Sequence, residues 1–169
     1  MPLLLYSFSK NVTYKNLILA IASLVFYAWG EPSLILLLFA AIIVNYFLAF
    51  GIGACHNRDS KRGAKALVSC AVVFDILMIG VFKYAAFAVS SVNSIFRMSF
   101  PIPEIALPLG ISFYTFQILT YVLDVYRKDT PVQKSFLKFT TFVSMFPQLV
   151  AGPIVRYRDV ADGLDNRSV

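Results

Sequence analysis

Residues 142–158 read FVSMFPQLVAGPIVRYR, a stretch apolar enough to lie in a membrane. Pro147, Gly152 and Pro153 interrupt it, and a proline removes a backbone donor and clashes with the preceding helical turn. In lipid, freed backbone groups are tolerated only where protein buries them or a water-filled cavity lies beside them. The sequence therefore predicts a broken or re-entrant segment near Pro147–Pro153, beside an internal cavity or tunnel.

The composition of the whole chain is that of a membrane protein. Of the 169 residues, 59% are hydrophobic and only 14% are charged, whereas a soluble domain carries about 25% charged residues. We therefore predict an all-α fold, a polytopic transmembrane helical bundle. Packing, small residues and a few hydrogen bonds hold such a bundle together, because there is no hydrophobic effect between helices inside lipid.

The net charge of +6 does not indicate a nucleic-acid partner, because the basic residues cluster in short loops, where charges orient a membrane protein. The most basic of these loops is predicted at Gly53–Lys65. It carries four basic residues and one acidic residue: Arg58, Lys61, Arg62, Lys65 and Asp59. Cytoplasmic loops are enriched in Lys and Arg, so we place this loop on the cytoplasmic side.

Neither the cysteines nor the histidine predict a metal site. Cys55 and Cys70 do not form a C-x-x-C pair, so they support neither a disulfide framework nor a zinc site. His56 stands at a helix end with no second ligand at a suitable spacing. We interpret His56 as an interfacial loop side chain.

Apolar stretches predict the membrane segments. Ser33–Ile52 has twenty residues without a charge, about 30 Å of helix, which matches the hydrocarbon thickness of a bilayer. The other expected helices are Asn16–Trp29, Ala66–Ser91, Leu109–Tyr126 and Ser135–Phe146, the last leading into the broken segment. Asn93–Pro108 is the longest irregular connection, and its low positive charge favours the outer side.

Three polar residues lie within or at the end of these apolar segments. For Asn45 an interhelical hydrogen bond is favoured over an active role. Asp75 needs a partner or a water-filled neighbour, and a functional and a structural role are equally open. Lys83 is eight residues from Asp75, about 12 Å along a helix, too far for a direct pair, and it can extend to the membrane interface instead.

Polar residues also form a stripe on one predicted helix. Residues 114, 117, 121 and 124 are spaced by three and four, which places them on one helical face, turned toward the protein interior or a cavity. Together with residues of the broken segment they give the cavity-lining candidates Tyr114, Gln117, Tyr121, Asp124, Gln148, Gly152, Pro153 and Arg156. They form no catalytic set. Taken alone, this pattern favours a small transporter or channel subunit, with a non-catalytic membrane scaffold as a further alternative.

A series of motifs carries a more specific signal. In chain order they are FYAWGEP (26–32), VNY (44–46), FKY (82–84), LPLGISFYTFQ (107–117), DVYR (124–127) and FPQLVAGPIVRY (146–157). The ordered series resembles the N-terminal portion of the membrane-bound O-acyltransferase family, in its alginate O-acetyltransferase branch.

The resemblance implies a larger enzyme of the cell inner (plasma) membrane that acts in alginate biosynthesis. Such an enzyme transfers an acyl group, usually acetyl, from a cytoplasmic thioester donor such as acetyl-CoA to a polysaccharide such as alginate. It implies a tunnel through the protein, an extracytoplasmic polysaccharide-modifying partner protein and no tightly bound cofactor.

The family's catalytic histidines lie in the later half of its chains, and nothing here corresponds to them. We therefore expect residues 1–169 to be the N-terminal part of a single membrane domain, incomplete at both ends. Without the missing C-terminal half, the chain is expected to be inactive, and no catalytic residue is assigned within it.

Overall fold

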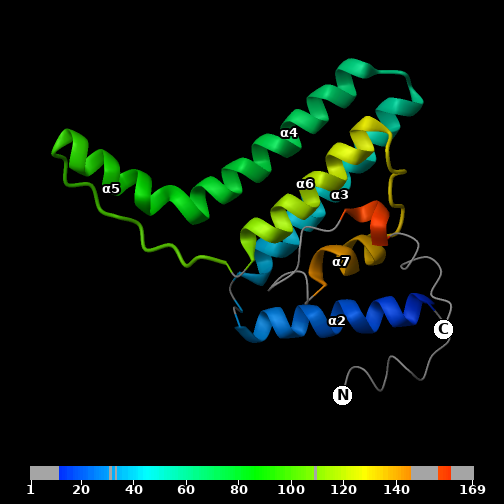
Figure 1. Ribbon diagram of the computed structural model, residues 1–169, viewed down its shortest axis with the longest axis horizontal. Coiled ribbons are helices and arrows are strands. Elements are labelled where there is room, and N and C mark those ends of the chain that lie inside the picture. Colours follow the sequence, from blue (N-terminus) through cyan, green and yellow to red (C-terminus); the bar gives the residue numbers. More distant parts are fainter. Residues whose placement is uncertain (1–11, 31, 33, 109, 146–155, 161–169) are drawn as a thin grey trace.

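The computed structural model describes residues 12–30, 32, 34–108, 110–145 and 156–160, most of them helical (Figure 1). The elements are α2 (Val12–Gly30), α3 (Ile35–Asn57), α4 (Lys61–Ile79), the π-helical turn η1 (Gly80–Tyr84), α5 (Ala85–Phe96), α6 (Ile111–Arg127) and α7 (Phe136–Ser144). Within these ranges there is no β-strand, which confirms the all-α prediction. The broken segment predicted near Pro147–Pro153 lies outside the described residues.

The predicted loop at Gly53–Lys65 is wrong, because helix occupies most of it. α3 runs to Asn57 and α4 begins at Lys61, so only residues 58–60 form a turn. Ser60 caps α4, its hydroxyl accepting a hydrogen bond from the Gly63 backbone at 3.4 Å. A Cβ on Gly63 would lie 2.9 Å from the Cys55 sulfur, so this glycine serves close packing rather than a loop.

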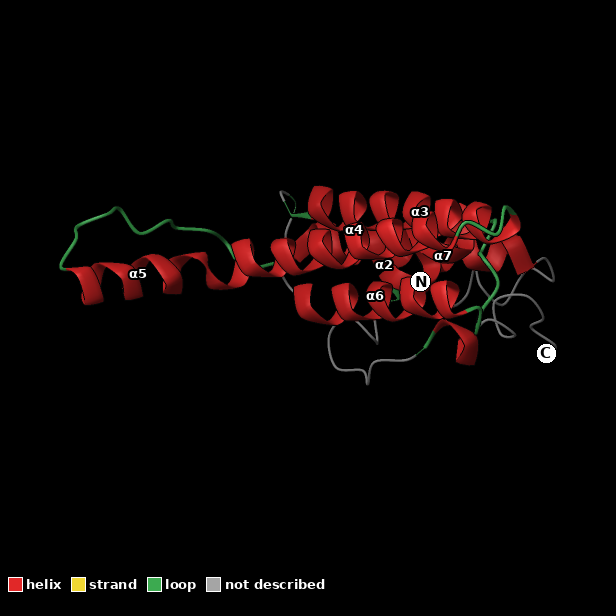
Figure 2. Cartoon of the chain, turned by 90° about the horizontal axis from the view of Figure 1, so that it is seen from above, coloured by secondary structure: helices red, strands yellow, loops and turns green. Residues whose placement is uncertain are grey.

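The helix that follows is longer than the predicted Ala66–Ser91 segment. α4, η1 and α5 are continuous from Lys61 to Phe96, 36 residues, or about 54 Å of helix against about 30 Å of hydrocarbon. The two parts meet at an angle at η1 (Figure 1), as expected for a π-helical turn within an α-helix. α5 projects from the bundle with no buried residue, and the connection to α6 runs back along it (Figures 1 and 2).

α6 is bounded by two residues with left-handed backbone. Gly110 (φ 71°) precedes it and Lys128 (φ 66°) follows it. At its C-terminal end, the backbone N–H of Lys128 donates to Val125 at 3.1 Å and that of Asp129 donates to Asp124 at 2.9 Å. These bonds satisfy carbonyl groups that a helix end otherwise leaves free. They fix the start of the segment that leads to α7.

Helices α3, α4 and α6 pack on one another, and α2 packs against α7. Large apolar side chains cover the outside; Leu36, Phe47 and Phe87 are about 70% exposed. Polar side chains are buried, among them Asn45, Asp75, Thr115, Gln117, Asp124, Thr140, Thr141 and Ser144. α3 and the helix at 61–96 are long and apolar enough to cross a membrane. The arrangement is that of a membrane protein, whose surroundings are as apolar as its core.

Candidate functional site

The predicted stripe on α6 is turned into the bundle. Tyr114, Gln117, Tyr121 and Asp124 are all buried, at most 6% exposed. The Gln117 side-chain amide donates to the backbone carbonyl of Phe142 on α7 at 2.8 Å. This bond joins α6 to α7 directly before the segment in which the broken backbone was predicted.

Tyr121 forms the centre of an aromatic cluster. Its ring lies 4.9 Å from that of Phe139 and 5.0 Å from that of Tyr157, and Tyr157 also contacts Phe142 at 5.1 Å between ring centroids. The Tyr121 hydroxyl accepts a hydrogen bond from the Gln133 backbone at 2.9 Å, and the Gln133 side chain donates to the Tyr157 hydroxyl. Edge-on and tilted ring pairs of this kind add stability beyond the area they bury.

Asp124 closes the stripe at the C-terminal end of α6. It is 6% exposed, and its Oδ2 atom has no hydrogen-bond partner among the described residues. A buried carboxyl oxygen without a partner is costly, because the group has lost its hydration without replacement. Asp124 is therefore the member of the stripe whose burial the described residues explain least.

A buried polar pair, separate from the stripe, lies between α3 and α4. The Asn45 side-chain amide donates to Asp75 Oδ1 at 2.8 Å and to the Ala41 carbonyl at 3.1 Å, and both side chains of the pair are fully buried. The predicted interhelical hydrogen bond of Asn45 is thus confirmed, and Asp75 has the partner that it was expected to need. Lys83 instead lies near Ser112, with 3.4 Å between Nζ and Oγ.

Of the other predicted site residues, the structure describes only Arg156. Gln148, Gly152 and Pro153 lie outside the described residues, and Arg156 is exposed. Its neighbour Tyr157 is the residue that reaches Tyr121. Sequence reasoning missed Tyr157 and Gln133 because both act through partners distant in the chain; the only signal was that each is polar and near an apolar segment.

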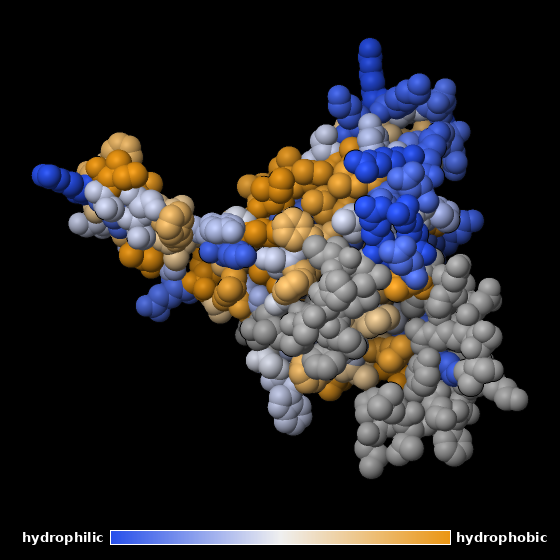
Figure 3. All heavy atoms as spheres, in the orientation of Figure 1, coloured by the Kyte–Doolittle hydropathy of each residue, from blue (hydrophilic) through white to orange (hydrophobic). Residues whose placement is uncertain are grey.

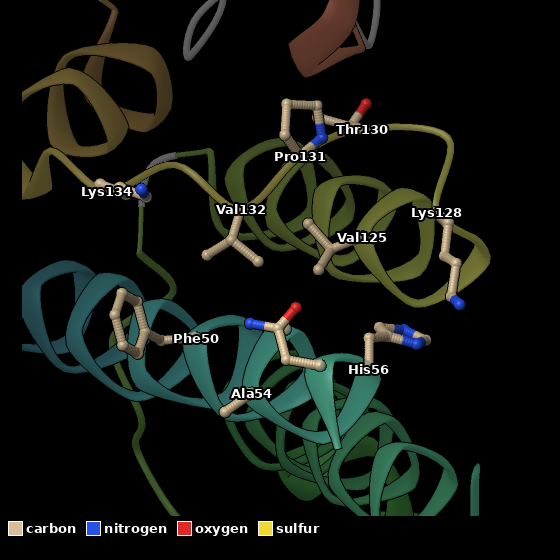
Figure 4. Close-up of a pocket in the computed structure, with 11 residues that line it drawn as sticks. Phe50, Ala54, His56, Val125, Lys128, Thr130, Pro131, Val132 and Lys134 are labelled. Carbon is tan, nitrogen blue, oxygen red and sulfur yellow. The ribbon is translucent and has the colours of Figure 1, made fainter. Parts of the chain in front are cut away.

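Two hollows lie at the end of the bundle where α3 and α6 finish. The larger, about 600 Å³, is lined by residues of α3, the end of α6 and the segment 130–134 (Figure 4). The smaller, about 260 Å³, lies at the α3–α4 turn. Neither is lined by the four residues of the stripe, so the cavity-lining role of the stripe stays a prediction.

Comparison with known proteins gives one consistent group. No family model and no solved structure matches the chain. It is 43% identical over 159 residues to the probable alginate O-acetylase AlgI of Pseudomonas aeruginosa and 41% identical over 159 residues to that of Azotobacter vinelandii. It is 30% identical over 181 residues to the peptidoglycan O-acetyltransferase of Helicobacter pylori.

These alignments cover 92% or 93% of the chain but only 30% to 34% of the three relatives. The chain thus spans about a third of the length of the curated relatives it matches. The matches cover nearly the whole chain, which also carries the motif series in order. They confirm the resemblance of the chain to the N-terminal portion of the membrane-bound O-acyltransferase family, in its alginate O-acetyltransferase branch.

Proposed function

We propose that the chain is part of an enzyme that transfers an acyl group, acetyl in the usual case, to hydroxyl groups of a polysaccharide such as alginate. The observation that carries this proposal is identity of 36–43% to five alginate O-acetylases over 92% of the chain. The donor is acetyl-CoA or another acyl thioester, and an extracytoplasmic protein takes part in modifying the polysaccharide.

Within that enzyme, the described residues form part of the helical wall around the passage and not the reaction centre. They place the α6 stripe and the Asn45–Asp75 pair inside an apolar bundle, and no catalytic residue is assigned to them. The proposed role of the stripe is to line the passage that the donor's acyl group crosses. The part of the relatives that has no counterpart in the chain would supply the reacting groups.

A chimera tests the proposed function. The matching N-terminal portion of the P. aeruginosa alginate O-acetylase is replaced by this chain, and acetylation of alginate is measured in cells that lack the natural enzyme. We expect acetylation to be retained. A chimera present in the membrane at the level of the natural enzyme, yet unable to acetylate, would contradict the proposal.

The proposed topology is multi-pass in the inner membrane, with the turn at residues 58–60 facing the cytoplasm. In a chain without Cys55 and Cys70, a cysteine replacing Ser60 should react with an impermeant maleimide only after the cells are permeabilised. A cysteine replacing Ser99, in the connection between α5 and α6, should react in intact cells. The reverse pattern would place the basic turn outside.

A further inference from the structure

The larger hollow has the size of a small-molecule site. Its volume of about 600 Å³ lies within the roughly 300–1,000 Å³ of typical ligand pockets. Three parts of the chain line it: the last turns of α3, the end of α6, and residues 130–134, which we call the strap. Its lining residues are all described: Phe50, Gly53, Ala54, His56, Asn57, Val125, Lys128, Thr130, Pro131, Val132 and Lys134.

The strap is held to both helices, so the hollow is a built feature rather than a gap under a loose loop. Tyr46 on α3 donates from its hydroxyl to the Lys134 carbonyl at 2.7 Å, and the Gln133 backbone donates to Tyr121 on α6 at 2.9 Å. Val132 lies so close to Gly53 that a Cβ there would be 2.4 Å from its Cγ2 atom.

The lining separates into an apolar wall and a polar end. Figure 4 shows Val125 and Val132 pointing into the hollow above Phe50, while His56 and Lys128 face each other at one end. His56 and Lys128 also line the smaller hollow, so they mark where the two spaces meet. The apolar wall suits a hydrocarbon or ring, and the polar end suits an anion.

The groups at the polar end lack partners in the described part of the chain. The Nε2 atom of His56 is buried without a hydrogen-bond partner, and no described carboxylate pairs with Lys128. A bound anion would give the buried His56 nitrogen a hydrogen-bond partner and would pair with the exposed Lys128 ammonium.

The surrounding charge favours a negative ligand. Residues 53–65 and 124–134 contain seven Lys and Arg side chains against three Asp side chains. Hydrophilic side chains gather over this end of the molecule, at the α3–α4 turn and the chain after α6 (Figure 3). Such a concentration of one sign of charge raises the local concentration of an oppositely charged ligand.

We propose that this hollow binds a phosphate-bearing ligand with an apolar portion. The phosphate lies between His56 and Lys128, which donate hydrogen bonds to its oxygens, and the apolar portion lies along Phe50, Val125 and Val132. Two sources share this chemistry, the headgroup of an anionic phospholipid and a soluble phosphorylated molecule. The proposal goes beyond acyl transfer and does not depend on it, since it is tested by binding alone.

Two probes distinguish the sources. Binding of inorganic pyrophosphate to the chain in detergent micelles reports the soluble source. For the lipid source, the chain is placed in phosphatidylcholine bilayers that also contain phosphatidylglycerol. Native mass spectrometry then counts the phosphatidylglycerol molecules that stay bound to it. Saturable binding of either probe supports the site, and absence of both overturns it, whatever the acylation result of the chimera.

Matched variants locate the binding. Lys128→Gln removes the cation, and His56→Phe keeps a ring beside Tyr126 but removes the donor nitrogen. Each should weaken binding about tenfold, the effect of one charge-assisted hydrogen bond. Lys65 is exposed at the same end of the molecule but lines neither hollow. Lys65→Gln should therefore change binding by less than about threefold.

If Lys128→Gln and Lys65→Gln weakened binding of the probe equally, the proposal would be overturned, because binding would then reflect general attraction to surface charge. Circular dichroism of each variant establishes that it folds. Because His56 and Lys128 belong to different elements, loss of the fold in one variant leaves the other as a test.

Discussion

Asn45 on α3 donates a 2.8 Å hydrogen bond to Asp75 on α4, and neither side chain has any exposed surface. The two residues are thirty positions apart, so the bond fixes how the two longest apolar helices pack. In a bundle without a hydrophobic effect between helices, such a bond is one of the few specific interactions available.

Removing the donor should therefore destabilise the chain. We expect Asn45→Ala to lower the free energy of unfolding by about 1–3 kcal/mol, because it leaves the Asp75 carboxyl buried without its partner. Unfolding in mixed micelles measures the effect. Asn57→Ala, at an exposed position on the same helix, serves as the control and should cost less than about 0.5 kcal/mol. Equal losses would show that the pair contributes nothing specific.

Gly53 should tolerate no side chain, in contrast to Gly80. A Cβ at Gly53 would overlap Val132, whereas nothing lies within 4 Å of one at Gly80. We expect Gly53→Ala to destabilise by about 1–3 kcal/mol through overpacking. Gly80→Ala should be neutral or stabilise by up to about 1 kcal/mol, because alanine loses less backbone entropy in a helix.

A double-mutant cycle assigns the cause of the Gly53 effect. If overlap with Val132 is responsible, Val132→Ala should recover part of the stability lost in Gly53→Ala, giving a coupling of at least about 0.5 kcal/mol. Additive losses in the double variant would contradict the contact.

The hydroxyls of Tyr46 and Tyr121, which bond to the strap, should control how often its backbone opens to solvent. Tyr46→Phe removes a donor to Lys134, and Tyr121→Phe leaves the Gln133 backbone N–H without its acceptor. Each should cost about 1 kcal/mol and raise amide hydrogen exchange across residues 130–134. Tyr126→Phe is the control, because no hydrogen bond of its hydroxyl occurs within the described residues. Unchanged exchange in both variants would show that the strap is held by other contacts.

Local pattern was enough to predict the apolar helices and the Asn45 bond. The three-and-four spacing of the polar residues put them on one face of α6, and the structure buries all four. The period of a helix decides such a face without reference to the rest of the chain. A lone amide in an uncharged segment likewise has few options other than a bond to a neighbouring helix.

Features that depend on distant partners were not predicted. The basic charge of residues 53–65 suggested a loop, but Gly53 and Gly63 lie in helices and permit close packing against Val132 and Cys55. Gln133 and Tyr157 are joined by a hydrogen bond between residues 24 positions apart. The larger hollow forms only where the strap lies across α3 and α6. Sequence spacing within one element carries no information on such crossings.

Asp124 provides the test of whether the stripe takes part in function. In the chimera, we expect Asp124→Asn to lower alginate acetylation about tenfold, because a buried carboxyl oxygen left unpaired by the described residues is retained at a cost in stability. The same substitution should leave the free energy of unfolding unchanged or raise it, since Oδ2 has no hydrogen-bond partner to lose among the described residues. Asp129→Asn, exposed and five residues away, is the matched control and should keep full activity. Normal acetylation in Asp124→Asn would show that the carboxyl has no part in the passage of the acyl group, and a loss of both stability and activity would assign it a purely structural role.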